Sequence, residues 1–270
     1  MRYLFLLIIT LTVTSCKTEK SVNTDLERWQ ETADNITIIR DNFGVPHIYG
    51  KTDADAVFGL LYAQCEDDFN RVEQNYIWAT GRLAEVEGED AIYSDLRAKM
   101  FMTEDEAKAN YDNSPEWLKE LCNAFADGIN YYLYTHPKVK PRLLTKFEPW
   151  MPMYFSEGSI GGDIERVSTR RIKSFYEGTD ISQFEIEKDK KQIAEAEPAG
   201  SNGIAIHGKL TKSGNPILLI NPHTSFFFRG EVHVISEEGL DAYGAVTWGQ
   251  FFVYQGFNEK TGWMHTSTYT

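Results

Sequence analysis

The fold of this chain is decided by the stretch Gly200-Ser201-Asn202-Gly203-Ile204-Ala205-Ile206-His207-Gly208. The segment before it, residues 185–197, is dominated by charged side chains and has little apolar periodicity. After Ser201, short runs rich in β-branched and aromatic residues alternate with turn residues. The glycine leaves the Gly200 carbonyl sterically open to attack by the hydroxyl of Ser201, although Gly-Ser alone is a common turn dipeptide. A new, sheet-forming segment therefore starts at Ser201.

The sequence after Ser201 predicts five short strands and a final run. The turns between them fall at residues 212–215, 237–239 and 259–262, where polar residues and glycine cluster. Strands are expected over residues 203–207, 216–220, 231–235, 242–247 and 251–254, and a last strand over 263–270.

The first half of the chain has helical periodicity after one hairpin. Strands are expected at 36–40 and 47–49, with a turn at 41–46 that contains Gly44. Thr52 and Asp55 form a capping box that begins a long helix, which runs toward Gly81. Ser114-Pro115 begins a second helix, which Pro137 ends. Together with the strands that follow, these helices predict an α+β fold.

The N-terminus has the features of an export signal. Met1-Arg2 gives a cationic start, and residues 3–13 are apolar but too few to span a membrane. The following Val13-Thr14-Ser15-Cys16 resembles a bacterial lipoprotein site, with Cys16 as the lipidated residue. The alternative is an ordinary secretory signal with an incidental cysteine. In both cases we expect a periplasmic protein, and in the first case one anchored to a membrane only through its lipid.

Composition limits the partners of the protein. The 270 residues carry a formal net charge of -13, spread along the chain, which disfavours nucleic acid because phosphate binding needs clustered Lys and Arg. Small molecules or proteins are the expected partners. Cys65 and Cys122 each lie on the apolar face of an expected helix, so we predict buried free thiols.

Two blocks of sequence carry a family resemblance. The run 201–208, followed by Leu218-Leu219-Ile220-Asn221-Pro222-His223, resembles the start of the catalytic β-subunit in the penicillin amidase family, which includes the acyl-homoserine-lactone acylases. Upstream, a second block resembles the opening of the family's α-subunit: Ile39-Arg40-Asp41-Asn42-Phe43-Gly44-Val45-Pro46-His47-Ile48-Tyr49 with Asp53, Ala54, Phe58-Gly59-Leu60, Ala63-Gln64, Asp67 and Gly81-Arg82-Leu83-Ala84-Glu85. Because two separate blocks occur in the right order, the chain is identified as a member of this family of N-terminal-nucleophile hydrolases.

The resemblance implies an organisation. Residues 1–15 would be the signal peptide, 16–174 a mostly helical α-subunit-like part, 175–200 a removable spacer, and 201–270 the start of the β-subunit. A precursor, or zymogen, would cut itself between Gly200 and Ser201 and give an α/β heterodimer. Family members continue for several hundred residues, so we expect the αββα sandwich to be incomplete here and the chain to stop within the β-subunit.

The resemblance also implies a chemistry. Ser201 would attack the amide of an N-acyl substrate such as a penicillin, an acyl-homoserine lactone or a lipopeptide. Its own α-amino group, with a reference pKa of about 7.7–8.0, would serve as the general base. Antibiotic synthesis or quorum quenching would be the biological setting, and the enzyme would be a hydrolase of carbon-nitrogen bonds in linear amides.

Further site residues follow from the same resemblance. His223 would orient Ser201 and contribute a backbone donor to the oxyanion hole, and the backbone N–H of Ser267 would be the second donor. The residues expected to line the substrate pocket are Thr224, Phe226, Phe227 and His265, although Thr224 replaces the aromatic residue usual in the family. The other histidines, His47, His136, His207 and His233, lack metal-ligand spacing and are interpreted as structural. No metal or cofactor is therefore predicted; the calcium ligands of some family members would lie beyond Thr270.

Two alternatives stay open. The chain could be an inactive remnant that acts at most as a lipid-anchored binding protein. It could also be another serine hydrolase, but the Gly-x-Ser-x-Gly motif of a nucleophile elbow is absent.

Overall fold

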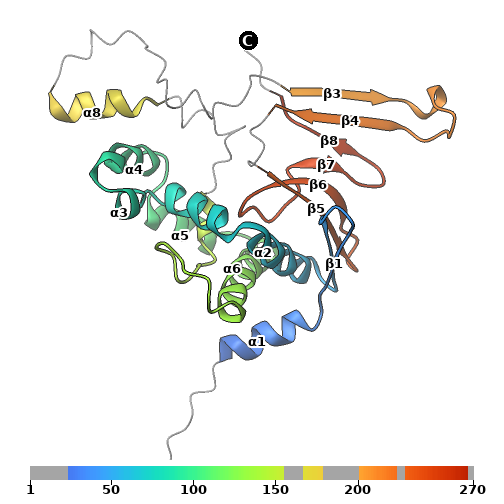
Figure 1. Ribbon diagram of the computed structural model, residues 1–270, viewed down its shortest axis with the longest axis horizontal. Coiled ribbons are helices and arrows are strands. Elements are labelled where there is room, and N and C mark those ends of the chain that lie inside the picture. Colours follow the sequence, from blue (N-terminus) through green and yellow to red (C-terminus); the bar gives the residue numbers. More distant parts are fainter. Residues whose placement is uncertain (1–23, 155–166, 179–200, 224–228, 267–270) are drawn as a thin grey trace, which may run out of the picture.

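The computed structural model describes residues 24–154, 167–178, 201–223 and 229–266. Helices gather on one side of the molecule and strands on the other, as the α+β prediction requires (Figure 1). The helices are α1 (Thr24–Ala33), α2 (Asp53–Ala79), α3 (Ala84–Glu87), α4 (Ile92–Lys99), α5 (Glu104–Asp112), α6 (Glu116–Thr135) and α8 (Thr169–Glu177). Short 3-10 turns lie at η1 (Glu89–Ala91), η2 (Met151–Tyr154) and η4 (Gly208–Leu210). The strands are β1 (Thr37–Arg40), β2 (Pro46–Gly50), β3 (Ser201–Ile206), β4 (Ile217–Pro222), β5 (Arg229–Ser236), β6 (Asp241–Thr247), β7 (Gln255–Phe257) and β8 (Gly262–Trp263).

The main sheet is built from both halves of the sequence. Its order is β1-β2-β5-β6-β7-β8, with β1 and β2 forming the predicted hairpin. The parallel pair β2–β5 joins the halves, and its register places His47 opposite His233. The two rings touch, with 2.9 Å between their Nδ1 atoms. Residues before and after Ser201 therefore share one sheet.

Helices α2 and α6 cover one face of this sheet and form the core with it. Both predicted helices are confirmed: α2 starts with the capping box of Thr52 and Asp55, and α6 starts directly after Pro115. Helix α2 is kinked at Asp68, whose φ of -159° is not helical. The largest fully buried side chains are mostly those of α2 and α6, including Phe58, Leu60, Tyr76, Phe125 and Ile129.

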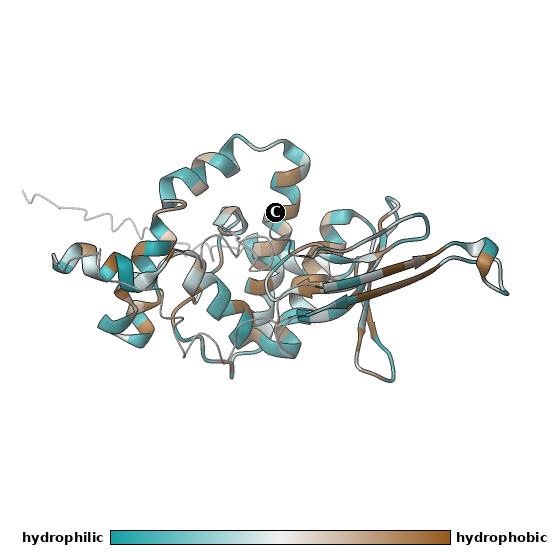
Figure 2. Ribbon diagram, turned by 90° about the horizontal axis from the view of Figure 1, so that it is seen from above, coloured by the Kyte–Doolittle hydropathy of each residue, from teal (hydrophilic) through white to brown (hydrophobic). Residues whose placement is uncertain are grey.

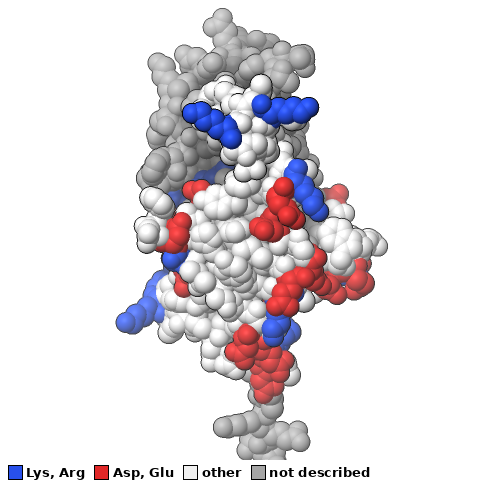
Figure 3. Space-filling model, turned by 90° about the vertical axis from the view of Figure 1, so that its right-hand side faces the viewer, with Lys and Arg blue, Asp and Glu red and all other residues white. Residues whose placement is uncertain are grey.

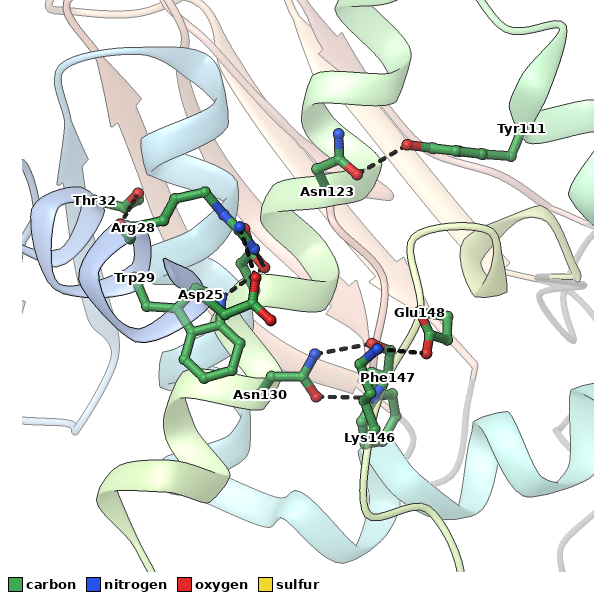
Figure 4. A network of polar contacts seen from close by, with 11 residues as sticks. Asp25, Arg28, Trp29, Thr32, Tyr111, Asn123, Asn130, Lys146, Phe147 and Glu148 are labelled. Carbon is green, nitrogen blue, oxygen red and sulfur yellow. Dashed lines mark hydrogen bonds and ion pairs between the residues drawn. The ribbon is translucent and has the colours of Figure 1, made fainter. Parts of the chain in front are cut away.

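Helix α1 was not predicted, and it has no buried residue of its own. It is attached to α6 by polar contacts, some of which are drawn in Figure 4: Arg28 donates twice to the carboxylate of Asp127, and the Trp29 indole N–H donates to the same group at 2.6 Å. The same view shows Asn130 of α6 bonded to the backbone N–H and carbonyl of Phe147, each at 2.8 Å. These bonds fasten the segments around the helical layer.

The predicted strand over residues 251–254 is wrong. This segment is a bend, and strand β7 begins only at Gln255. The N–H of Gln250 bonds to the carbonyl of Thr247 and that of Tyr254 to Ala245, which closes a compact connection between β6 and β7. Phe251 and Val253 pack against the core from this connection. Their strand propensity reflects burial rather than an extended backbone. The last predicted strand, 263–270, is limited to Gly262–Trp263 within the described residues.

Helix α2 holds the connection after β6 through three side chains. Gln64 accepts from the N–H of Gly249 and donates to the carbonyl of Gln250, both at 2.8 Å. Tyr76 donates to the carbonyl of Gly249, and Asn75 to that of Trp248. Gly249 has φ +90°, and a Cβ there would lie 2.7 Å from the Tyr76 ring. These contacts bind the connection to α2 across more than 170 residues of sequence.

Replacing Gln64 by alanine should therefore weaken the contact between the halves. Gln64 is 1% exposed, and its loss leaves one backbone donor and one acceptor without their bonds. We expect the free energy of unfolding to fall by about 2–3 kcal/mol. The measurement is a urea titration of the purified protein. The control is Gln30→Ala on the exposed surface of α1, which should change stability by less than about 0.5 kcal/mol; equal effects of the two variants would contradict the role of Gln64.

Strands β3 and β4 form a separate hairpin that projects beside β8 (Figure 1). Apolar residues make up much of both strands, which are drawn brown in Figure 2, and Ile204, Ile217 and Leu219 are about half exposed. The base of the hairpin approaches the segment after β8 closely. A Cβ on Gly203 would lie only 2.1 Å from Sδ of Met264, so only glycine fits there without a shift. This contact brings the start of β3 next to residues 264–266.

The remaining general predictions concern thiols, charge and membranes. Cys65 and Cys122 are buried and free, as predicted, and burial raises the pKa of the Cys122 thiol to about 11. On the face shown in Figure 3, acidic side chains gather over the lower part, and the basic side chains drawn there do not merge into one surface. Within the part of the chain that the structure describes, no helix has both the length and the apolar character needed to cross a membrane.

Candidate active site

Ser201 is the first residue of β3, and the hairpin brings His223 to it. In the register of β3 and β4, Ser201 lies opposite Pro222, and His223 follows directly. The backbone N–H of His223 donates to Oγ of Ser201 at 3.4 Å. The two residues singled out from the sequence therefore meet, and the contact comes from the backbone of His223.

The imidazole of His223 faces a different residue. Its Nε2 lies 3.0 Å from the side-chain nitrogen of Asn202. Because an amide nitrogen can only donate, Nε2 is the acceptor in this contact. Asn202 fixes the ring next to Ser201.

The backbone of Ser201 is bound by Thr266. The N–H of Ser201 donates to Oγ1 of Thr266 at 3.0 Å, and the same hydroxyl donates to the carbonyl of Ser201 at 3.1 Å. The two residues are 65 positions apart in sequence. A single side chain thus holds both backbone polar groups of Ser201.

His265 lies just before this contact, packed in a polar and aromatic group. Its ring centroid is 4.4 Å from that of Tyr254, and the guanidinium of Arg229 lies 4.6 Å from the same tyrosine ring. The carbonyl of His265 accepts from the side chain of Gln255 at 3.3 Å. Among the described residues, the buried Nδ1 of His265 has no hydrogen-bond partner.

Several predicted site residues lie outside the described residues. These are Cys16, Gly200, Thr224, Phe226, Phe227 and Ser267. Their roles in lipidation, cleavage, the substrate pocket and the oxyanion hole stay predictions. Within the described ranges, no group of three or more His, Cys, Asp or Glu side chains is arranged to hold a metal ion.

Sequence reasoning missed Asn202, Gln255 and Thr266. Asn202 was part of the quoted stretch but had no assigned contact. Thr266 lies between His265 and Ser267, which were both predicted to belong to the site. A signal for this position was therefore present in the sequence. Gln255 gave no signal because its partner, the carbonyl of His265, is ten residues away in the segment after β8.

The comparison with known families gives the geometry its context. The sequence model of a family described as penicillin amidase matches residues 35–270. The chain belongs to the penicillin amidase family. The match includes both sequence blocks, the shared sheet and all the described residues around Ser201.

Two curated proteins that the chain resembles are acyl-homoserine lactone acylases. The acyl-homoserine lactone acylase PvdQ of Pseudomonas syringae pv. tomato is 22% identical over 265 residues, which are 88% of this chain and 34% of that protein. The acyl-homoserine lactone acylase QuiP of Pseudomonas aeruginosa is 31% identical over 124 residues, 44% of this chain and 15% of that protein. PvdQ is matched over most of this chain, but the match covers only about a third of PvdQ. The chain thus spans about a third of the length of this relative.

The comparison with solved structures also gives a match. It is the thermostable penicillin G acylase from Alcaligenes faecalis, with 19% identity and a TM-score of 0.36 over 59% of this chain and 80% of that one.

Proposed function

We propose that the protein containing this chain is an acylase that hydrolyses the amide bond of an N-acyl substrate through an acyl-enzyme on Ser201. The observation that carries the proposal is the bond from the backbone N–H of His223 to Oγ of Ser201, in a chain of the penicillin amidase family. A donor aimed at the serine oxygen holds that oxygen in one position. It also lowers the cost of negative charge on this oxygen during attack.

The first step is self-cleavage. Oγ of Ser201 attacks the carbonyl carbon of Gly200, the C–N bond between the two residues breaks, and the nitrogen takes a proton to become an α-amino group. Water then hydrolyses the ester and returns the hydroxyl to Ser201, leaving a carboxylate on Gly200. An α-amino group with a pKa of about 7.7–8.0 keeps a useful neutral fraction near neutral pH.

The catalytic cycle uses the same oxygen. The neutral α-amino group accepts the proton of Oγ, directly or through one water, as Oγ attacks the acyl carbon of the substrate. The proton passes to the leaving amine, an ester forms on Ser201, and water releases the acid. The backbone N–H of Ser267 and that of His223 are the proposed donors to the oxyanion, and the open Nδ1 of His265 supplies a polar group for the substrate pocket.

The two parts would stay together after cleavage. The pair β2–β5 and the bonds of Gln64, Asn75 and Tyr76 to residues 248–250 connect sequence on either side of Ser201. The proposed product is therefore an α/β heterodimer. The signal peptide 1–15 and lipidation of Cys16 would place it in the periplasm, on a membrane.

The names of the relatives favour an acyl-homoserine lactone as substrate. The test is release of homoserine lactone from acyl-homoserine lactones of several chain lengths, with penicillin G compared in parallel. Amine release from at least one substrate, with an acid product of matching mass, is expected. No release of amine from any of them by the full-length gene product would contradict the acylase and would favour the alternative of an inactive, lipid-anchored binding protein.

A further inference from the structure

We propose that Thr266 is a positioning residue that sets the direction of the Ser201 α-amino group. The inference rests on the proposed function, because the amino group exists only after cleavage between Gly200 and Ser201. It concerns a residue for which neither the family match nor the relatives' names assign a role.

The backbone geometry at Ser201 points to this role. Ser201 lies opposite Pro222 of β4, and because its N–H and carbonyl both point to Thr266, the two residues form a non-hydrogen-bonded pair of the antiparallel ladder. The side of Ser201 that faces away from β4 is bound by the side chain of Thr266.

The two bonds fix the direction in which the Thr266 hydroxyl donates and accepts. A threonine hydroxyl has one proton, and that proton is donated to the carbonyl of Ser201 at 3.1 Å. Toward the nitrogen, 3.0 Å away, the same oxygen can only accept. Thr266 therefore binds the N–H of Ser201 and, after cleavage, would not compete for the lone pair of the new amine.

The acceptor role of Thr266 becomes important once cleavage has converted the Ser201 nitrogen to an amine. A free amino group rotates about its bond to Cα, and its lone pair is productive only when it faces Oγ or a bridging water. One N–H held by Thr266 restricts that rotation, so the lone pair keeps a defined direction. The same bond also favours the protonated amine, because a charged donor binds an oxygen acceptor more strongly than a neutral one.

Thr266 itself is held by its neighbours. Gln255, 3% exposed, donates to the carbonyl of His265, and the Trp263 indole N–H donates to the carbonyl of Val253 at 3.0 Å. Met264 packs at Gly203 so closely that a Cβ there would clash. The backbone on the N-terminal side of Thr266 is thus fixed against both β7 and β3.

The test compares Thr266→Val with Thr266→Ser in the full-length protein. Valine keeps the shape but removes the acceptor, whereas serine keeps the hydroxyl. With Val we expect kcat for amide hydrolysis to fall about 10- to 100-fold with KM unchanged, because the base is misdirected while the pocket is intact. With Ser we expect kcat within about threefold of the wild type. Thr32→Val, on α1, is the control and should leave kcat unchanged.

A second readout does not depend on turnover. Cyanate labels neutral amines, and mass spectrometry of the N-terminal Ser201 peptide follows its labelling against pH. In Thr266→Val the midpoint for this amine should move to lower pH, since the acceptor that favours the protonated form is gone, and Thr266→Ser should restore it. The lysine side chains provide internal controls in each sample.

The outcomes separate the two proposals. If the protein is cleaved at Ser201 but hydrolyses no amide, the acylase fails while the labelling still decides on Thr266. Unchanged kcat and an unchanged labelling midpoint in Thr266→Val would overturn the positioning role. So would failure of Thr266→Ser to restore them, because the methyl group would then be what matters. A protein that never exposes an N-terminal Ser201 would overturn both proposals.

Discussion

Replacing Ser201 by alanine should abolish cleavage between Gly200 and Ser201 and reduce amide hydrolysis to background. The hydroxyl is the proposed nucleophile in both reactions, and loss of a catalytic serine costs on the order of 10⁶-fold in kcat. The fold should survive, because Ser201 is at the edge of a hairpin and its backbone bonds to Thr266 do not need the side chain. The measurements are gel analysis of chain length and amine release from the best acyl substrate.

Ser213→Ala is the matched control. Ser213 lies in the turn between β3 and β4, where its hydroxyl accepts from the N–H of Asn215 at 3.3 Å. We expect normal cleavage and turnover in this variant. Retained amine release in Ser201→Ala would show that another group performs the chemistry.

The largest effect on stability is expected at Glu73. This carboxylate is fully buried and accepts three backbone N–H bonds, from Arg142, Leu143 and Leu144, at 2.7–2.9 Å. It holds an irregular segment against α2. Glu73→Ala removes all three acceptors, and we expect the free energy of unfolding to fall by about 3 kcal/mol. The midpoint of urea unfolding, followed by circular dichroism, measures the change.

Two further variants make this prediction specific. Glu73→Gln keeps one oxygen, which can serve the pair Leu143 and Leu144, so it should cost about half as much. Glu120→Ala, on the exposed face of α6, should change stability by less than about 0.5 kcal/mol. If Glu73→Ala were no more destabilising than Glu120→Ala, water would have to satisfy the three N–H groups.

Much of the fold could be predicted because local sequence patterns determine its main helices and strands. Helices α2 and α6 have long apolar stripes and clear start signals, and strands β3 to β6 lie between turn residues. Helix α1 escaped prediction because it is held by side-chain bonds of Arg28 and Trp29 to Asp127 of a distant helix. Helix α5 was also not predicted, although the capping box of Thr103 and Glu106 is a recognisable signal for its start.

The ends of helices and strands were harder to predict from the sequence where contacts with distant residues determine them. The aromatic run 251–254 satisfies strand propensity, yet bonds from Gln64 and Tyr76 hold the preceding residues in a bend. Helix α8 ends at Glu177, so the spacer start predicted at residue 175 falls inside a helix. The extent of the spacer stays a prediction.

The residues of the candidate site were likewise only partly predictable from the sequence. Ser201 and His223 could be selected because a family motif contains both, and the hairpin geometry joins them. Thr266 and Gln255 act through contacts that appear only when β3, β7 and the segment after β8 lie side by side. No local pattern encodes that arrangement.

The central claim is that Ser201 becomes an N-terminus by self-cleavage. It is tested most directly by the intact mass and N-terminal sequence of the full-length gene product after expression. We expect a fragment that begins Ser-Asn-Gly-Ile-Ala-Ile in the wild-type protein and no such fragment in Ser201→Ala. An uncut wild-type chain, or a cut at a different residue, would contradict it.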